Sequence, residues 1–581
     1  MTSTRVLNQA GSALGLTLFL LAGCNAIVGL DKVQVSNAPA DSAGSSSGGQ
    51  PNAEGGSASG GKGGMASEAG SGATPDQSDA GAAGDSSGPV GDCTTNQECT
   101  DRLSEEAMGE GGASGAVVPA ACIKTPIPHC VKLLSEDCDA ITGDYNNDQA
   151  IFLGSLFSTK GATAPTNLPR QQSAALAIEQ INAVGGVPDG STSANPRPLV
   201  MVSCDESTNL VRAATHLVSD LHVPAIVGPN TSQDTLDVST KVTVPGGTVV
   251  MSPTGVASSI ASLSDNDLTW LMVPSDVQRA PLMINQIGVL ETTLRAARNN
   301  KQYINLGIVF RNDALGIGTR TALNELSING QSLANPINLN NHVQIDPYNG
   351  TGAQPAITTK YLTFLPDIVV LAGTAEAIAV MVDLEAKWPV DVDRPHYVLI
   401  DSTKVPELLT AVTNNDDLRH RVRGTGITPG EMGKDMPAET FTGFQVDYNV
   451  RYGTSATISG MGPAHDAAYA IGLALAATRT KEVTGASVAQ GLRMLAGGTT
   501  KLTATAPNVL PAFKKLAAGE KITAVGTFGM LDWDEDGAVK GGVLEMWCIG
   551  GPSTKPAYGS SGLFYDLKSR AYTGTYVQCT P

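Results

Sequence analysis

Polar side chains stand directly after apolar runs at several places in this sequence, and one serine lies inside such a run. Hydroxyl groups can donate or accept hydrogen bonds, and a carboxylate can pair with a cation, so together they could hold a small polar ligand without a cofactor. The chemistry that this pattern predicts is reversible binding. The candidate ligand-binding residues are Ser155, Thr231, Ser232, Ser252, Thr254 and Asp401.

The stretch 225–233 (AIVGPNTSQ) is the most informative of these places, because an apolar run stops there at Gly-Pro. If Thr231 or Ser232 is the N-cap of a following helix, the loop presents hydroxyls beside the unpaired amides of a helix N-terminus, which favours anions. The alternative is that the hydroxyls only cap their own helix. Asp234 favours that alternative, since a carboxylate in the first turn already complements the helix dipole.

Strands and helices that could position these side chains alternate from residue 150 onward. Residues 170–186 place apolar side chains on one face and end in Gly-Gly, which predicts a helix with a glycine C-cap. Continuous apolar strands separated by helices indicate an α/β fold with parallel sheets covered on both faces. The strand-to-helix loops then lie at one edge, where such sheets bind ligands. The predicted strands are 151–157, 199–204, 225–228, 248–252, 304–310, 367–373 and 396–401.

The N-terminus has the form of an export signal. Arg5 precedes the apolar stretch 13–21, which is too short to span a bilayer as a mature helix, and Leu-Ala-Gly-Cys follows at 21–24. This tetrapeptide resembles the bacterial lipobox. The resemblance implies that residues 1–23 are a lipoprotein signal peptide and that Cys24 is lipidated, so the protein would work outside the cytoplasm on a membrane anchor.

A flexible tether is predicted between Cys24 and residue 91. Of residues 36–91, 38 are Gly, Ser or Ala, so this segment cannot bury enough apolar surface to offset its ordering entropy. Both G-x-S-x-G matches of the chain, at Ser46 and Ser86, lie inside it. A nucleophile elbow needs a strand before the serine and a helix after it, so neither match indicates a hydrolase.

Charge and motif content exclude other classes of function. The chain has 55 acidic and 37 basic residues, a formal charge of −18, which argues against nucleic acid as a partner. The seven histidines are scattered, and no glycine-rich phosphate loop or zinc-protease motif follows a strand. We therefore predict no enzymatic activity and no cofactor.

Eight cysteines remain once Cys24 is assigned to lipid, and an even count in an exported chain predicts four disulfides. Five lie in residues 92–147 and three lie in the larger part, so both groups are odd and one bridge should join them. The Cys138–Cys204 pair is the predicted link, because Cys138 just precedes the first core strand and Cys204 ends the second. Zinc is the alternative, but His129 is the only histidine of the small module and no C-x2-C pair occurs. The eight residues are Cys93, Cys99, Cys122, Cys130, Cys138, Cys204, Cys548 and Cys579.

Several segments, in order and spacing, resemble the type I periplasmic binding proteins, and most nearly the branched-chain amino-acid binding proteins of ABC importers. The resemblance covers about 148–581 and implies two α/β lobes joined by three crossovers, which close on a small ligand. The matching segments are INAVGGV (181–187), LVMVSCDES (199–207), VPAIVGPNTSQDT (223–235), VVMSPTG (249–255), IVFRNDALGIG (308–318), HDAAYAIGLALAA (465–477) and FGMLDWDEDGAVKGG (528–542).

Carried onto this chain, the resemblance also predicts domain boundaries. A small disulfide module would occupy 92–147. Lobe one would comprise 148–275 and 428–530, and lobe two would comprise 276–427 and 531–581.

The resemblance gives roles to the candidate residues. Thr231 and Ser232 would grip a ligand carboxylate, and Asp401 would pair with a ligand ammonium, unless it only caps the following turn. The second loop has Val256 at the position of a further hydroxyl, although Thr254 could replace it. Leu315 stands where relatives often have a pocket-walling tyrosine, so a small polar or carboxylate ligand fits as well as an α-amino acid.

The predicted function is therefore that of an extracytoplasmic solute-binding lipoprotein, with a small-molecule ligand and an ABC permease as partners. The alternative is a ligand-sensing receptor of the same fold without a permease. The D-x-D-x-D-G motif at 532–537 resembles half of a calcium loop, but the position of its bidentate glutamate is Val543, so no metal is predicted.

Overall fold

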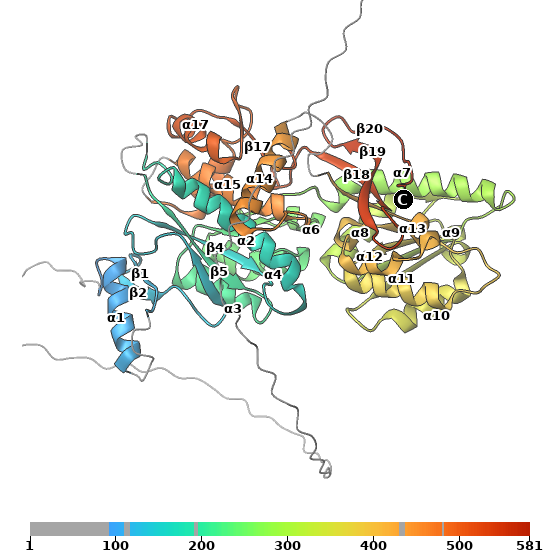
Figure 1. Cartoon of the computed structure of the whole chain (residues 1–581), viewed down its shortest axis with the longest axis horizontal. Coiled ribbons are helices and arrows are strands. Elements are labelled where there is room, and N and C mark those ends of the chain that lie inside the picture. Colours follow the sequence, from blue (N-terminus) through green and yellow to red (C-terminus); the bar gives the residue numbers. More distant parts are fainter. Residues whose placement is uncertain (1–91, 110–116, 191–195, 429–435, 479–481, 581) are drawn as a thin grey trace, which may run out of the picture. The chain divides into compact units, whose positions relative to one another are not determined.

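The computed structural model describes residues 92–109, 117–190, 196–428, 436–478 and 482–580 (Figure 1). The predicted signal peptide, the lipidation site Cys24 and the tether lie outside these residues. Within the described ranges, no helix combines the length and the apolar character needed to cross a membrane.

Six strands form the first large sheet, in the order β3-β5-β4-β6-β7-β8. All neighbours are parallel except β3, which pairs antiparallel with β5 at one edge. The apolar runs predicted β4, β5, β6 and β7, because a strand covered by helices on both faces has no solvent-facing positions, whereas β3 and β8 were not predicted. Their bounds are β3 (Cys138–Thr142), β4 (Ile151–Phe157), β5 (Leu199–Asp205), β6 (Ala225–Val227), β7 (Val249–Ser252) and β8 (Thr269–Leu271).

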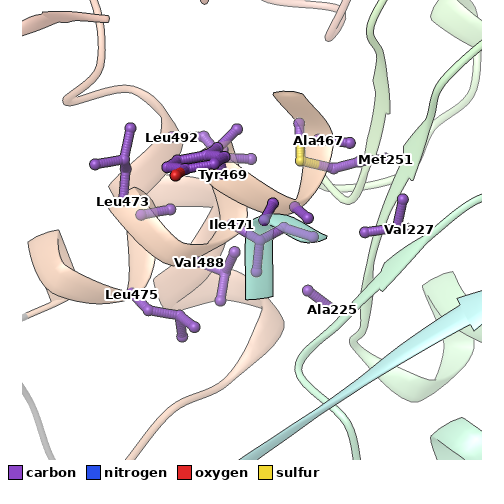
Figure 2. Close-up of a cluster of buried hydrophobic side chains, with 14 of the residues drawn as sticks. Ala225, Val227, Met251, Ala467, Tyr469, Ile471, Leu473, Leu475, Val488 and Leu492 are labelled. Carbon is purple, nitrogen blue, oxygen red and sulfur yellow. The ribbon is translucent and has the colours of Figure 1, made fainter. Parts of the chain in front are cut away.

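Helices from two distant parts of the chain cover this sheet. Helix α15 packs against α2, α16 and α17, and its residues 461–476 are buried all round, which explains its almost uniformly apolar sequence. Figure 2 shows Tyr469 and Ile471 of α15 in the same cluster as Ala225 and Val227 of the sheet. The helices are α2 (Ala164–Ala183), α3 (Leu210–Thr215), α4 (Ser232–Val238), α5 (Val244–Gly246), α6 (Ser258–Ala261), α14 (Met436–Tyr452), α15 (Met461–Thr478), α16 (Gly485–Leu492) and α17 (Ala506–Ala517), with the strand pair β16 (Lys501–Thr503) and β17 (Thr523–Val525).

Eight strands form the second large sheet, in the order β12-β9-β13-β14-β15-β18-β19-β20. Its first five strands are parallel and were predicted in part. The last three are antiparallel, an extension that the sequence analysis missed. The strands are β9 (Leu306–Arg311), β12 (Val343–Tyr348), β13 (Ile368–Ala372), β14 (His396–Leu399), β15 (Val422–Ile427), β18 (Val543–Gly550), β19 (Ala557–Asp566) and β20 (Ala571–Thr573).

The second sheet has its own helices and core. Helix α7 begins with a complete capping box at Ser275 and Gln278, in which each side chain bonds the other residue's backbone amide. The helices are α7 (Asp276–Ala297), α8 (Ala314–Ala322), α9 (Pro336–Asn341), α10 (Gln354–Phe364), α11 (Ala375–Lys387), α12 (Pro406–Val412) and α13 (Asp416–Arg421), with the hairpin β10 (Ser327–Ile328) and β11 (Gln331–Ser332).

The chain passes between the two sheets three times: after β8, after β15 and before β18. This confirms the predicted α/β fold with two sheet units and three crossings. The last crossing lies later than the predicted boundary at 530/531. Leu531, Trp533 and Val539 still pack in the core of the first sheet, and Trp533 donates to the Leu271 carbonyl at 2.8 Å.

The segment before the first sheet contains α1 (Asn96–Gly109) and the hairpin of β1 (Ala120–Ile123) with β2 (His129–Lys132). Its apolar core is small, and two disulfides, Cys93–Cys122 and Cys99–Cys130, cross it. A third disulfide joins Cys138 to Cys204, the pairing predicted from their positions beside the first two core strands, and the fourth joins Cys548 to Cys579.

Removing the Cys138–Cys204 link, by changing both residues to alanine, should lower the free energy of unfolding by about 2–5 kcal/mol. The bridge closes a loop of 66 residues and therefore restricts the unfolded chain. Urea denaturation without reductant measures the change. The Cys548→Ala/Cys579→Ala protein is the matched control, with a 31-residue loop. A free Cys204 thiol in a non-reducing peptide map of the parent protein would contradict the pairing.

Candidate functional site

The candidate site lies at the edge of the first sheet where its parallel strands end at their carboxyl termini. The loop after β6 begins at Gly228, whose φ of +104° is a conformation that side chains with a Cβ rarely adopt. A Cβ at this position would also collide with the carbonyl oxygen of Leu156 in the neighbouring strand. The apolar run therefore ends in glycine because the loop must pass close over β4.

Thr231 is the N-cap of α4. Its Oγ1 accepts a hydrogen bond from the Asp234 amide at 3.1 Å and donates to the Asp234 carboxylate at 2.5 Å. The first of these bonds satisfies an unpaired amide at the start of the helix, so the hydroxyl has the capping role that the sequence left open.

Ser232 is 3% exposed and ties two loops together. Its Oγ accepts hydrogen bonds from the amides of Val256 at 3.0 Å and Ala257 at 3.2 Å, in the loop that follows β7. The Ser232 hydroxyl holds the loop after β7 against the loop after β6. A change at Ser232 would therefore affect a ligand by moving the loop after β7.

Thr254 lies in the same second loop and is only partly buried. Its Oγ1 donates to the backbone carbonyl of Asn230 at 2.5 Å and contacts the side-chain Oδ1 of the same residue at 2.8 Å. A Cβ added at Gly460, just before α15, would lie 2.5 Å from Thr254 Cγ2 and 2.8 Å from Arg170 Nε. Three segments far apart in sequence therefore meet at this point of the edge.

Two of the predicted ligand-binding residues are corrected by the structure. Ser155 is fully buried within β4, where its Oγ donates to Ser203 Oγ at 3.0 Å. Ser252 is also fully buried, and its Oγ donates to the Pro229 carbonyl at 2.8 Å. A strand buried on both faces does not reveal from sequence which of its residues faces the edge, and these two hydroxyls bond inside the protein.

Arg170 is a site residue that the sequence analysis missed. It lies on α2, its Nε donates to the Ser459 carbonyl at 2.8 Å, and its Nη1 donates to Asn167 Oδ1 at 2.8 Å. Its Nη2 has no hydrogen-bond partner among the residues that the structure describes. Burial lowers the pKa of Arg170 to about 10, and the charge of Asp401 opposes that shift, so the guanidinium stays protonated near neutral pH.

One feature of the sequence could have identified Arg170 as a candidate site residue. A helix that begins at residue 170 would place a cation in its first turn, where the dipole disfavours one. The helix begins at Ala164 instead and contains Pro169.

Asp401 follows β14, where the parallel strands of the second sheet end at their carboxyl termini. The predicted partner of Asp401 is a ligand ammonium, but an arginine of the protein already pairs with Asp401. Its Oδ2 forms an ion pair with Nη1 of Arg279 on α7, and the two side chains are 15% and 6% exposed. Arg279 also donates from Nε to the Pro274 carbonyl at 2.8 Å. The acid is thus already paired within the protein.

Glu206 follows β5 and is 6% exposed. Its Oε1 accepts a hydrogen bond from Ser158 at 3.2 Å, and its Oε2 is buried without a partner in the described part of the chain. Burial raises the pKa of Glu206 to about 8, and the charges of Asp234 and Asp205 add to the rise. This carboxyl is therefore mostly protonated at pH 7.

Two features could indicate a metal site: the D-x-D-x-D-G motif and clusters of potential metal-ligating atoms. Asp534 Oδ1 accepts the amides of Asp536 at 3.1 Å and Ala538 at 2.9 Å, so the D-x-D-x-D-G motif forms a turn closed by its own aspartate. In the described ranges, the clusters of potential metal-ligating atoms all contain disulfide-bonded cysteines, whose sulfurs are not thiolates. The clusters comprise Asp92, Cys93, Cys99, Cys122 and Cys130.

Thr231→Val should lower the free energy of unfolding by about 1 kcal/mol, the usual cost of losing an N-cap, and leave ligand affinity nearly unchanged. Ser232→Ala should instead weaken binding, because two amides of the loop that holds Thr254 lose their acceptor. Urea denaturation and titration calorimetry on both variants separate the two effects. Weakened binding in Thr231→Val with unchanged stability would contradict the capping role.

Solved structures provide the comparison with known proteins. The chain is similar to the branched-chain amino-acid substrate-binding protein LivJ of Streptococcus pneumoniae, solved with isoleucine (15% identity, 71% of this chain and 99% of that chain, TM-score 0.49). It is also similar to a substrate-binding protein from Desulfitobacterium hafniense solved with Leu (17%, 71% and 100%, 0.47) and to a branched-chain amino-acid ABC transporter protein from Thermus thermophilus with bound valine (14%, 70% and 95%, 0.46). No protein-family model matches the sequence, and neither does any curated protein.

Proposed function

We propose that this protein is an extracytoplasmic solute-binding lipoprotein that captures a small polar ligand, an amino acid or a related carboxylate, and delivers it to an ABC permease. The observation that carries the proposal is Arg170. A protonated guanidinium stands at the carboxyl edge of an α/β sheet, where such sheets bind ligands, with one NH2 group unpartnered among the described residues and close to the partly buried side chain of Thr254.

A guanidinium in this setting is suited to a carboxylate. Arginine donates two parallel hydrogen bonds to a carboxylate, and charge-assisted bonds of this kind are stronger than neutral ones. The bonds to Ser459 and Asn167 fix the orientation of Arg170 before a ligand arrives. Little side-chain entropy would then be lost on binding.

The cysteine chemistry supports a location outside the cytoplasm. All eight cysteines of the described chain form disulfides, and such bonds persist in oxidising compartments. We propose that lipidated Cys24 anchors the protein to a membrane there, on the strength of the Leu-Ala-Gly-Cys sequence.

Arg170→Met should weaken binding of a carboxylate ligand about ten- to a hundredfold, since it removes one or two charge-assisted hydrogen bonds. A thermal-shift screen of amino acids and small carboxylates identifies ligands, because bound ligand raises the melting temperature, and calorimetry then compares the proteins. Arg451→Met is the control: its exposed side chain pairs with Glu179 on α2, so it removes the same charge away from the site. Equal affinity in Arg170→Met and the parent protein would overturn the assigned role.

A further inference from the structure

We infer that the ligand is a carboxylate without an ammonium group on the neighbouring carbon, such as a plain or 2-hydroxy carboxylate, because Arg279 already occupies Asp401. This inference rests on the proposed function and names its substrate class.

Arg279 is held firmly in its place. It lies one turn into α7, a helix fixed by a capping box at its start, and its Nε bond to the Pro274 carbonyl anchors the guanidinium from a second side. At 5% exposure the residue is buried among closely packed neighbours. A ligand ammonium at Asp401 would therefore share the carboxylate with a buried cation that the protein itself supplies.

Among the described residues, no second acid forms an ion pair with Arg279. Asp276 is the nearest other carboxylate on α7, and its Oδ1 accepts the amides of Ser258 at 3.2 Å and Val277 at 2.7 Å. Burial raises the pKa of Asp276. The same amide bonds and the charge of Arg279 oppose this rise. The carboxylate of Asp276 is therefore already bonded to backbone amides. Asp401 is the only direct ion-pair partner of Arg279 in the described chain.

The second terminal nitrogen of Arg279 is buried. Arg279 Nη2 and Thr425 Oγ1 both lack hydrogen-bond partners in the described residues, and the two residues, together with Asp401, line a cavity of about 10 Å³. That volume is close to the minimum for a single water molecule, which could bridge the two groups, and it is too small for an organic ligand. The free donor of Arg279 therefore serves the interior of the protein.

Two guanidiniums thus act near one carboxylate. Arg279 neutralises Asp401, and the charge of Asp401 also opposes the lowering of the Arg170 pKa by burial. A carboxylate at Arg170 finds an unpaired cation, whereas an ammonium beside it finds an acid already neutralised and two like charges. Such a site selects against zwitterions through repulsion as much as through attraction to anions.

The test is titration calorimetry of the parent protein with matched triplets of probes that share one carbon skeleton. The triplets are L-leucine, L-2-hydroxy-4-methylpentanoate and 4-methylpentanoate; L-alanine, L-lactate and propionate; and L-glutamate, L-2-hydroxyglutarate and glutarate. In every triplet that binds, the amino acid should bind at least tenfold more weakly than the better of its two analogues.

The outcomes separate this inference from the function beneath it. Tighter binding of the amino acid in a triplet overturns the inference and leaves the solute-binding function in place. Binding by no member of any triplet overturns both together. Neither outcome depends on a variant that has to fold.

Arg279→Met provides a second arm, because it frees Asp401 and should reduce the discrimination against amino acids at least threefold. The matched control is Arg298→Met, which removes another partly buried arginine at the far end of α7, paired there with Asp367. The control should lose stability as well but keep the selectivity of the parent protein. Equal selectivity of the parent protein and a folded Arg279→Met variant would overturn the role of Arg279.

Discussion

Glu206→Gln should leave the free energy of unfolding unchanged near pH 4 and raise it by about 5 kcal/mol near pH 9, relative to the parent protein. The sign follows from the pKa of Glu206, which burial raises from its ordinary value of 4.5 to about 8 in the folded chain. Between these values the folded state keeps a proton that the unfolded state releases, so stability falls as the pH rises. The magnitude follows from about 1.4 kcal/mol for each pKa unit.

The structure explains why glutamine is the informative replacement. Glutamine has the shape of the protonated acid and can keep a hydrogen bond with Ser158, but it cannot ionise. Asp234, whose pKa is also raised by burial, and Asp205 face Glu206 in both proteins, so most of their own contribution cancels in the difference. What remains is the titration of Glu206.

Urea denaturation at several pH values between 4 and 9 measures the effect. Glu105→Gln, at an exposed position on α1, is the matched control and should change the unfolding free energy by less than about 0.5 kcal/mol throughout. A pH-independent difference between Glu206→Gln and the parent protein would show that Glu206 does not titrate in this range.

Seven of the parallel strands were predictable, because burial on both faces leaves a local mark, whereas the parallel strands β8, β12 and β15 were not predicted. Runs such as Leu199–Asp205 and Ile151–Phe157 are continuously apolar apart from one or two residues, and Gly228 marks the end of β6 where the backbone passes β4. The strands β19 and β20 were missed, because they carry a mixture of polar and apolar residues and follow no helix. Strand β18 was missed although it is apolar apart from Glu545 and lies inside the sheet.

The candidate site was predictable only as far as it depends on neighbouring residues. The N-cap at Thr231 lies within one loop and could be named as an alternative. The ion pair of Arg279 with Asp401 and the contact of Arg170 with Ser459 join segments more than a hundred residues apart. No local pattern encodes such pairings, so Asp401 was interpreted without the cation that neutralises it.

Asp401→Asn should lower the free energy of unfolding by about 3–5 kcal/mol, because it leaves the charge of Arg279 buried without a partner. Arg279→Met should also destabilise the protein, by leaving the Asp401 carboxylate unpaired in a partly buried position. The double variant Arg279→Met/Asp401→Asn removes both charges, so it should be more stable than Asp401→Asn alone and recover much of the loss.

The comparison of the four proteins forms a double-mutant cycle, measured by urea denaturation at pH 7. The control cycle uses Arg451 and Glu179, whose side chains are 52% and 33% exposed and should couple by less than about 1 kcal/mol, since water screens the pair. A coupling energy for Arg279 and Asp401 no larger than that of the control pair would mean that Asp401 is solvated and open to a ligand cation. A large coupling energy would mean that the protein itself uses the negative charge at this edge, which is the condition for a site that rejects ammonium groups.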